Sequence, residues 1–192
     1  MDFTSNVNNR VSRSVSGKVQ RLKTGAQFFS FKLKSPPLTK ADFKQIFPFI
    51  AQQDGQFDTF TVVLPELGST TGTATGTITV LDDSTYTGAS IDAGSIQVPV
   101  VNENNTGTLK KGDLIKFSNH DKVYMLTSDI NLDLSSVNEL DIYPPLVTAV
   151  DGNTTVVYNN VPIKVYLDED QQSFTVQADG TYRYELNCVE EI

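Results

Sequence analysis

The sequence lacks tryptophan and has one cysteine and one histidine among its 192 residues. The single cysteine excludes an internal disulfide framework and is typical of a protein that folds in a reducing cytoplasm. The single histidine excludes sites that need several histidines, such as clustered metal ligands. The apolar runs are far shorter than the roughly 20 residues that a membrane-spanning helix requires. The first ten residues also lack the apolar core of a secretion signal, so the sequence favours a globular domain without a membrane partner.

Charge is distributed unevenly along the chain. Residues 1–50 have a net charge of +7, whereas residues 51–192 have a net charge of −15. Opposed charges suit head-to-tail contacts between copies of the chain, or binding of nucleic acid by the basic segment. Solvated surface residues that interleave after folding would explain the charges equally well. The candidate interface residues are Arg10, Arg13, Lys18, Arg21 and Lys23.

Short stretches of alternating apolar and polar residues predict a mainly β fold. Residues 109–127, LKKGDLIKFSNHDKVYMLT, alternate on both sides of a polar break and therefore predict a β-hairpin. Further strands are predicted at residues 17–22, 27–33, 57–64, 77–81, 95–101, 139–143, 155–158, 162–167, 173–177 and 181–190. Short strands separated by turn signals indicate a β-sandwich or barrel.

One short helix is predicted, at about residues 39–51. Thr39 is the expected N-cap, with Asp42 in the capping-box position. Pro48 lies inside the pattern and predicts a kink or an early end of the helix. The apolar stripe that supports the helix consists of Phe43, Ile46, Phe47 and Ile50.

The predicted organisation has three parts. Residues 1–16 form a flexible N-terminal arm. Residues 17–66 together with residues 147–192 form a β-sandwich that includes the helix. Residues 67–146 form an inserted small β-barrel, whose first residues, 67–77, are a loop or linker rich in Gly and Thr.

No group of residues indicates catalysis, so the sequence predicts a protein that is not an enzyme and needs no cofactor. His120 lies at the tip of the predicted hairpin without a nucleophile motif beside it, which favours a solvated turn residue. Cys188 alternates onto an apolar strand face and is predicted to be buried and unreactive. Tyr182 and Tyr184 on that face predict core or interface packing rather than stacking on bases or sugars.

Residues 129–133 have the D-x-N-x-D pattern that begins a calcium loop. Leu134 replaces the glycine that the loop requires, and Glu139 falls one residue short of the bidentate position. A polar loop between strands is therefore favoured, and a weak calcium site at Asp129 and Asp133 stays open as an alternative. The GTLKKGD stretch lacks the ending of a phosphate-binding loop. Residues 168–170, Asp-Glu-Asp, are more typical of a charged turn than of a cation site.

The order of predicted elements resembles a known family. Residues 24–65, TGAQFFSFKLKSPPLTKADFKQIFPFIAQQDGQFDTFTVVLP, give strand, Pro-Pro, helix, D-G-Q and strand. This order resembles the N-terminal part of structural tail proteins of tailed bacteriophages, especially distal tail and tail-tube-like subunits. Residues 109–146, LKKGDLIKFSNHDKVYMLTSDI…ELDIYPPL, resemble small phage β-barrel domains. The resemblance implies a ring of identical subunits, commonly six, around a central channel.

The favoured hypothesis is a virion structural protein whose ring joins the tail tube to the baseplate or tail tip. The resemblance implies assembly in the host cytoplasm and three partners: copies of the chain, other tail tube, baseplate or hub proteins, and DNA passing through the channel without sequence-specific binding. One alternative is a carbohydrate-binding or adhesion module that uses exposed tyrosines such as Tyr86 or Tyr143. A hydrolase with a carboxylate pair is another alternative.

Overall fold

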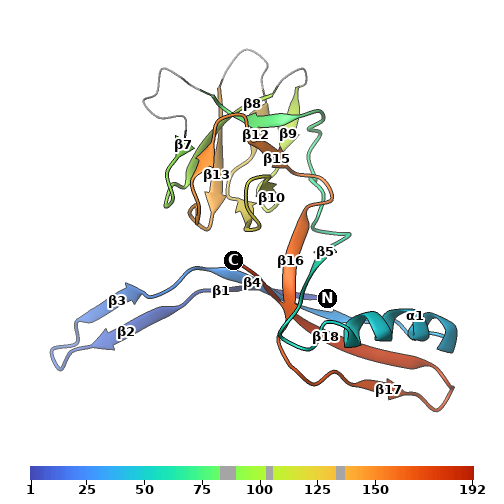
Figure 1. Cartoon of the computed structure of the whole chain (residues 1–192). Coiled ribbons are helices and arrows are strands. Elements are labelled where there is room, and N and C mark those ends of the chain that lie inside the picture. The colour runs from blue at the N-terminus through green and yellow to red at the C-terminus, as the bar shows by residue number, and fades with distance from the viewer. Residues whose placement is uncertain (83–89, 103–105, 133–136) are drawn as a thin grey trace. The chain divides into compact units, whose positions relative to one another are not determined.

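The computed structural model describes residues 1–82, 90–102, 106–132 and 137–192. The chain divides into two units, which are described separately below. Unit 1 contains Met1–Phe60 and Lys164–Ile192, and unit 2 contains Thr61–Ile163. The chain passes between the units within β5 (Thr59–Val63) and again within β16 (Pro162–Leu167) (Figure 1).

Unit 1 is built on a six-stranded sheet in the order β1-β4-β18-β16-β5, with β17 paired to β18. The strands not yet bounded are β1 (Asp2–Asn6), β4 (Phe28–Lys34), β17 (Phe174–Val176) and β18 (Tyr182–Glu190). Alternation in β4 places Phe29 and Phe31 inward, where both are buried. Antiparallel register sets Phe31 opposite Cys188, so the centre of the sheet is apolar on this face.

The helix α1 (Lys40–Ala51) forms where the sequence predicts it. The Thr39 hydroxyl accepts a hydrogen bond from the amide of Asp42 at 3.3 Å and donates to the carboxylate of Asp42 at 2.7 Å. Phe43 is buried, with its ring 4.6 Å from the ring of Tyr182. The helix runs through Pro48 to Ala51, so the expectation of an early end is wrong. Burial of Phe43 and Ile50 on either side of Pro48 offsets the one missing backbone donor. No helix in the described part of the chain is long and apolar enough to cross a membrane.

Unit 2 contains a closed six-stranded barrel in the order β10-β11-β13-β8-β6-β15. Its strands are β6 (Ile78–Val80), β8 (Gln97–Asn102), β10 (Leu114–Phe117), β11 (Val123–Leu126), β13 (Asn138–Tyr143) and β15 (Thr155–Val157). Strands β10 and β11 form the hairpin that the sequence predicts, with Ile115 opposite Tyr124. The barrel interior is filled by apolar side chains, among them Ile78, Val98, Val100, Ile115, Phe117, Leu126, Leu140 and Val156.

Two short antiparallel pairs accompany the barrel. One joins β9 (Gly107–Leu109) to β12 (Ile130–Leu132), and the other joins β7 (Ser90–Ile91) to β14 (Val150–Asp151). The prediction of a mainly β chain with one short helix and a small barrel is confirmed.

The limits of the parts differ from those expected. Strand β15 pairs with both β10 and β6 and thereby closes the barrel, so unit 2 extends to Ile163 and does not end at residue 146. Residues 1–16, expected as a flexible arm, contain β1 and the first strand, β2 (Asn9–Arg13), of a hairpin whose second strand is β3 (Val19–Lys23). Both differences arise from pairing with strands elsewhere in the chain, which hydrophobic periodicity does not report.

Candidate assembly surface

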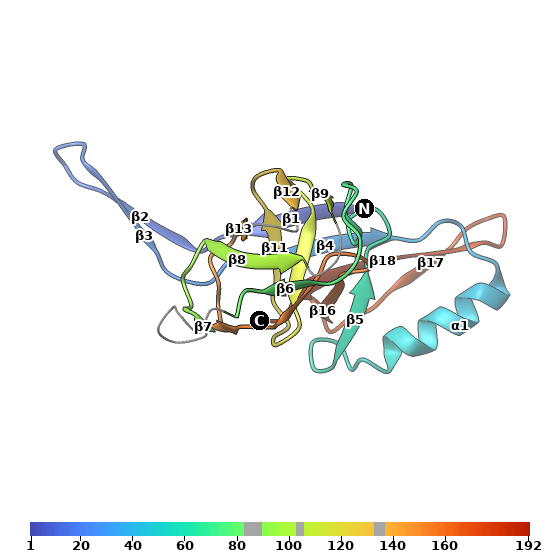
Figure 2. The same cartoon turned by 90° about the horizontal axis from the view of Figure 1, so that it is seen from above.

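Strands β2 and β3 form an antiparallel hairpin, residues 9–23, which we call the arm hairpin. It projects from the end of unit 1 farthest from α1 and β17 (Figures 1 and 2). Its turn is closed by a 2.9 Å hydrogen bond from the amide of Gly17 to the carbonyl of Ser14. Gly17 has φ +81°, a conformation that favours glycine. At the base of the hairpin the amide of Thr24 donates to the carbonyl of Asn8 at 2.8 Å.

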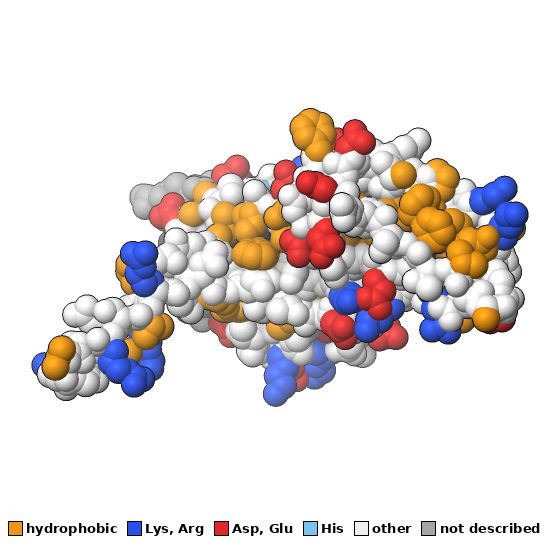
Figure 3. Space-filling model, turned by 90° about the horizontal axis from the view of Figure 1, so that it is seen from below, with side chains coloured by type: hydrophobic (Ala, Val, Ile, Leu, Met, Phe, Trp, Pro, Cys, Tyr) orange, Lys and Arg blue, Asp and Glu red, His pale blue; other side chains and the backbone are white. Residues whose placement is uncertain are grey.

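The arm hairpin brings together all five candidate interface residues, Arg10, Arg13, Lys18, Arg21 and Lys23. It contains no acidic residue. None of the five cations forms an ion pair with another residue in the part of the chain that the structure describes. Figure 3 shows basic and hydrophobic side chains along the projecting hairpin. The hairpin is therefore a concentrated positive surface with no internal counter-charge.

Apolar side chains lie among these cations, and the sequence analysis missed them. Val11 is 61% exposed and Leu22 is 63% exposed. The register places Val11 opposite Arg21 on one face, and Leu22 opposite Arg10 on the other. Val11 is the one apolar residue in the five residues of β2, so the sequence has no alternation there that distinguishes a strand from an irregular arm.

The arm hairpin buries almost nothing within its own chain, because every residue of β2 and β3 is exposed. A two-stranded hairpin in water is marginally stable without a third strand or a packed face. Exposed valine and leucine side chains between cations are therefore suited to burial against another macromolecule.

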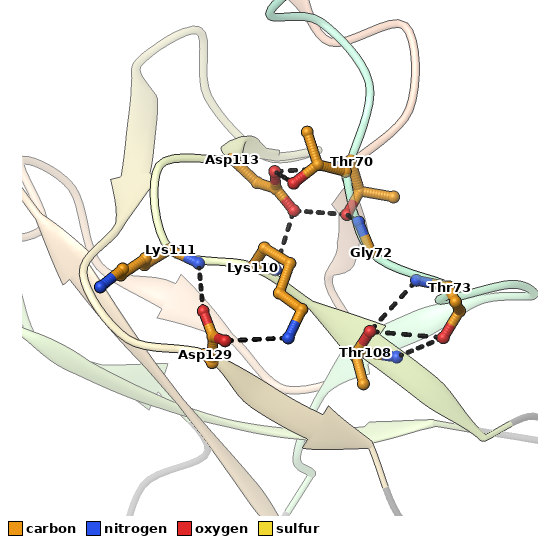
Figure 4. Close-up of polar contacts among 9 residues, drawn as sticks. Thr70, Gly72, Thr73, Thr108, Lys110, Lys111, Asp113 and Asp129 are labelled. Atoms are coloured by element: carbon orange, nitrogen blue, oxygen red, sulfur yellow. Dashed lines mark hydrogen bonds and ion pairs between the residues drawn. The ribbon is translucent and has the colours of Figure 1, made fainter.

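A second polar site lies in unit 2, around Asp113, which is 4% exposed (Figure 4). Its carboxylate accepts hydrogen bonds from the Lys110 amide at 2.9 Å, from the Thr71 amide at 3.0 Å and from the hydroxyls of Thr70 and Thr71. Burial favours a raised pKa for Asp113, but these hydrogen bonds together outweigh burial and lower the pKa. Asp113 thus holds the loop at Thr70 and Thr71 against the barrel, which is a structural role.

The loop or linker expected at residues 67–77 is held against β9 as part of unit 2. The amide of Thr73 donates to the Thr108 hydroxyl at 3.2 Å, and the amide of Thr108 donates to the Thr73 hydroxyl at 3.2 Å. Between these bonds, a Cβ atom on Gly72 would lie 1.9 Å from the backbone carbonyl oxygen of Thr108. Glycine is needed here for close approach of two backbones, not for flexibility.

Asp129, the first residue of the possible calcium loop, already has partners. Its carboxylate accepts from the Lys110 ammonium at 2.8 Å and from the Lys111 amide at 3.0 Å (Figure 4). The Lys110 hydrogen bond, followed by that of Lys111, lowers the pKa of Asp129. Asp133 lies outside the described residues, so the calcium alternative stays a prediction. Among the described residues, no group of three or more His, Cys, Asp or Glu side chains is arranged to hold a metal ion.

His120 is half-buried and hydrogen-bonded, so the expectation of a solvated turn residue is wrong. Its Nε2 atom lies 2.9 Å from the Tyr124 hydroxyl, and its Nδ1 atom lies 2.7 Å from Oδ1 of Asn119. The Tyr124 hydroxyl also accepts from the amide of Val147 at 3.1 Å. Burial, followed by the charge of Lys116, lowers the pKa of His120. The ring therefore joins the hairpin turn to a neighbouring segment of unit 2.

The remaining candidates lie as follows. Cys188 is buried, as predicted, and burial raises the pKa of its thiol to about 12. Tyr182 packs against Phe43 in unit 1, which confirms a packing role for that strand face. Tyr143 is 36% exposed, whereas Tyr86 lies outside the described residues. The carbohydrate-binding alternative therefore stays a prediction.

Comparison with known proteins agrees with the predicted resemblance. A family model described as "Distal tail protein pb9, B domain" matches residues 82–161, a range inside unit 2. The chain is also similar to Distal tail protein pb9 of Escherichia phage T5, with 27% identity over 168 residues, which cover 87% of this chain and 78% of pb9. The resemblance to distal tail proteins of tailed bacteriophages is thereby confirmed, and it supports a structural role in the virion tail.

Proposed function

We propose that this chain is a tail structural subunit that assembles into a ring, which joins the tail tube to the baseplate or tail tip. The similarity to Distal tail protein pb9 supports the place of the chain in a tail. The arm hairpin supports self-assembly, because it is fully exposed, carries five cations and needs a packed face to be stable.

The ring is proposed to contain six copies around a channel through which DNA passes without sequence-specific binding. Its other partners are tail tube, baseplate or hub proteins, met during assembly in the host cytoplasm. The chain's role in this proposal is mechanical and not catalytic. Contacts between unlike patches on neighbouring copies suit such a ring, because a head-to-tail contact with the correct rotation closes on itself.

Removal of the arm hairpin tests the proposal. Because Thr24 donates to Asn8 at 2.8 Å at the base of the hairpin, residues 9–23 can be replaced by the two-residue turn Asn-Gly. We expect the unaltered chain to form rings in negative-stain images and a multimer by light scattering, and the shortened chain to be a monomer with an unchanged circular dichroism spectrum. A folded, unaltered chain that stays monomeric at every concentration, with tail extract present, would refute the proposal.

A further inference from the structure

A second charged surface lies on unit 1, where two segments far apart in sequence meet. The amide of Gln56 donates to Oδ1 of Asp170 at 3.2 Å, and the Gln56 side chain donates to the carbonyl of Asp168. Gly55 permits this approach, because a Cβ atom there would lie 2.7 Å from the Cα atom of Asp170. We call this surface the acidic turn; its carboxylates are Asp54, Asp58, Asp168, Glu169 and Asp170, and all five residues are exposed.

The acidic turn also carries an unusually exposed aromatic ring. Phe57, between two of the carboxylates, is 83% exposed. Moving a phenylalanine side chain from water into an apolar contact is favourable, because apolar surface is removed from water. No lysine or arginine occurs in residues 45–60 or in residues 165–182, the segments that surround the turn. The acidic turn is therefore a negatively charged surface with one exposed aromatic side chain.

The arm hairpin has the complementary features. A hollow on it is lined by Arg10, Ser12, Gln20, Arg21 and Leu22. Leu22 supplies an apolar wall, and Arg10 on the same face supplies a guanidinium group that can both stack on an aromatic ring and pair with a carboxylate. Arg21 also borders the hollow, although the register places its side chain on the other face of the hairpin. The hairpin carries five cations and the turn carries five carboxylates. Neither surface has a charge of the other sign within its own segments.

We propose that Phe57 of one copy seats in the arm-hairpin hollow of a second copy, where Arg10 pairs with a carboxylate of the acidic turn. This inference rests on the proposed function and identifies the two patches that meet in the ring. The arm hairpin points away from α1 and from the rest of unit 1 in both views of the chain (Figures 1 and 2), so the turn that it binds belongs to another copy. The contact joins two unlike patches, which is the kind of contact that a ring repeats.

Cross-linking tests whether the two patches touch. Ser12→Cys in the hollow and Asp58→Cys beside Phe57 keep both Leu22 and the aromatic ring in place. Cys188 gives no background, because it is buried and its thiol pKa is about 12. With a short bismaleimide, the double variant is expected to give a ladder of covalent multimers that ends at the ring size. The matched control is Ser12→Cys with Val176→Cys, an apolar position 55% exposed in unit 1, and we expect about ten-fold less product.

Charge exchange tests whether the contact is electrostatic. Arg10→Glu/Arg21→Glu and Asp54→Lys/Asp58→Lys should each raise the concentration needed for assembly by about ten-fold or more. An equal mixture of the two variants is expected to assemble again, since the introduced glutamates of one variant then meet the introduced lysines of the other. Loss of folding in either variant would appear as a changed circular dichroism spectrum, and the cross-linking test then decides the question.

The outcomes separate this inference from the proposed function. Rings in negative-stain images without the Ser12–Asp58 ladder would overturn the inference and leave the proposed function standing. Absence of any multimer would overturn both. Assembly unaffected by the Arg10→Glu/Arg21→Glu variant, together with loss of binding to a short DNA duplex, would assign the hairpin to nucleic acid and overturn the inference.

Discussion

Asp113 and Asp129 are two carboxylates of unit 2 that differ in burial and in the number of hydrogen bonds that they accept. Both carboxylates accept hydrogen bonds from the segment at Lys110 and Lys111, but Asp113 is 4% exposed whereas the side chain of Asp129 is 52% exposed. We expect Asp113→Ala to destabilise unit 2 far more than Asp129→Ala does. The comparison sets a buried carboxylate that accepts four hydrogen bonds against an exposed carboxylate that accepts two.

The magnitude follows from the donors that each variant leaves unpaired. Hydrogen bonds to a charged group contribute about 1.5–3 kcal/mol each. The hydroxyls of Thr70 and Thr71 can turn to water, so the amides of Thr71 and Lys110 dominate the loss at Asp113. Two such bonds give about 3–6 kcal/mol for Asp113→Ala, and the loss at Asp129 should be far smaller because its ion pair is exposed to water.

Urea unfolding followed by circular dichroism measures the two free energies of unfolding, and hydrogen exchange at residues 106–115 shows whether the loss is local to the loop contact. The pKa of Asp113 is lowered in the folded chain. Its contribution is therefore fully present above the unfolded pKa of about 3.9 and is lost as the pH falls through the lower folded value. The reasoning would be refuted if Asp113→Ala and Asp129→Ala lowered the free energy of unfolding equally. It would also be refuted if the difference between the two variants stayed the same at low pH.

Three further outcomes are expected. Burial lowers the pKa of His120, so folding favours the neutral imidazole. The free energy of unfolding should therefore fall as the pH drops below the unfolded pKa of about 6.5. Thermal melts at pH 7.5 and 5.5 measure this fall, and His120→Gln should reduce it. Gly72→Ala should prevent native packing of its loop, because the new Cβ atom would lie 1.9 Å from the backbone carbonyl oxygen of Thr108. Gly112→Ala is the control, because its Cβ atom meets no atom within 4 Å and it should cost only the strain of φ +91°. Urea unfolding measures the free energy of unfolding of both variants. Cys188 should resist a thiol reagent in the folded chain and react at once in urea, and fast reaction without urea would contradict its burial.

Local patterns in the sequence predict local structure well. The hairpin of β10 and β11 follows from alternation on either side of a polar turn, and the start of α1 follows from Thr39 and Asp42. These elements are set by residues within a few positions of one another. Their prediction needs no knowledge of the rest of the chain.

Structure that depends on distant pairing could not be predicted in this way. The limit of the barrel depends on β15 pairing with β6, more than seventy residues earlier in the chain. The acidic turn depends on the hydrogen bond from the Gln56 amide to the Asp170 carboxylate, and no local sequence pattern predicts that contact. The five cations of the arm hairpin were predicted as a group from composition, but the apolar partners Val11 and Leu22 became visible only once the register of β2 and β3 was known.

The backbone hydrogen bond at the base of the arm hairpin makes the hairpin an exchangeable segment. Because Asn8 and Thr24 are already joined by a backbone hydrogen bond, the segment between them can be lengthened, shortened or exchanged without altering the register of the sheet that follows. In the proposed ring, a few substitutions on this segment and on the acidic turn would keep the tail subunits of two related phages apart within one cell. An engineer could use the same exchange to make subunits that alternate in a fixed order around a ring.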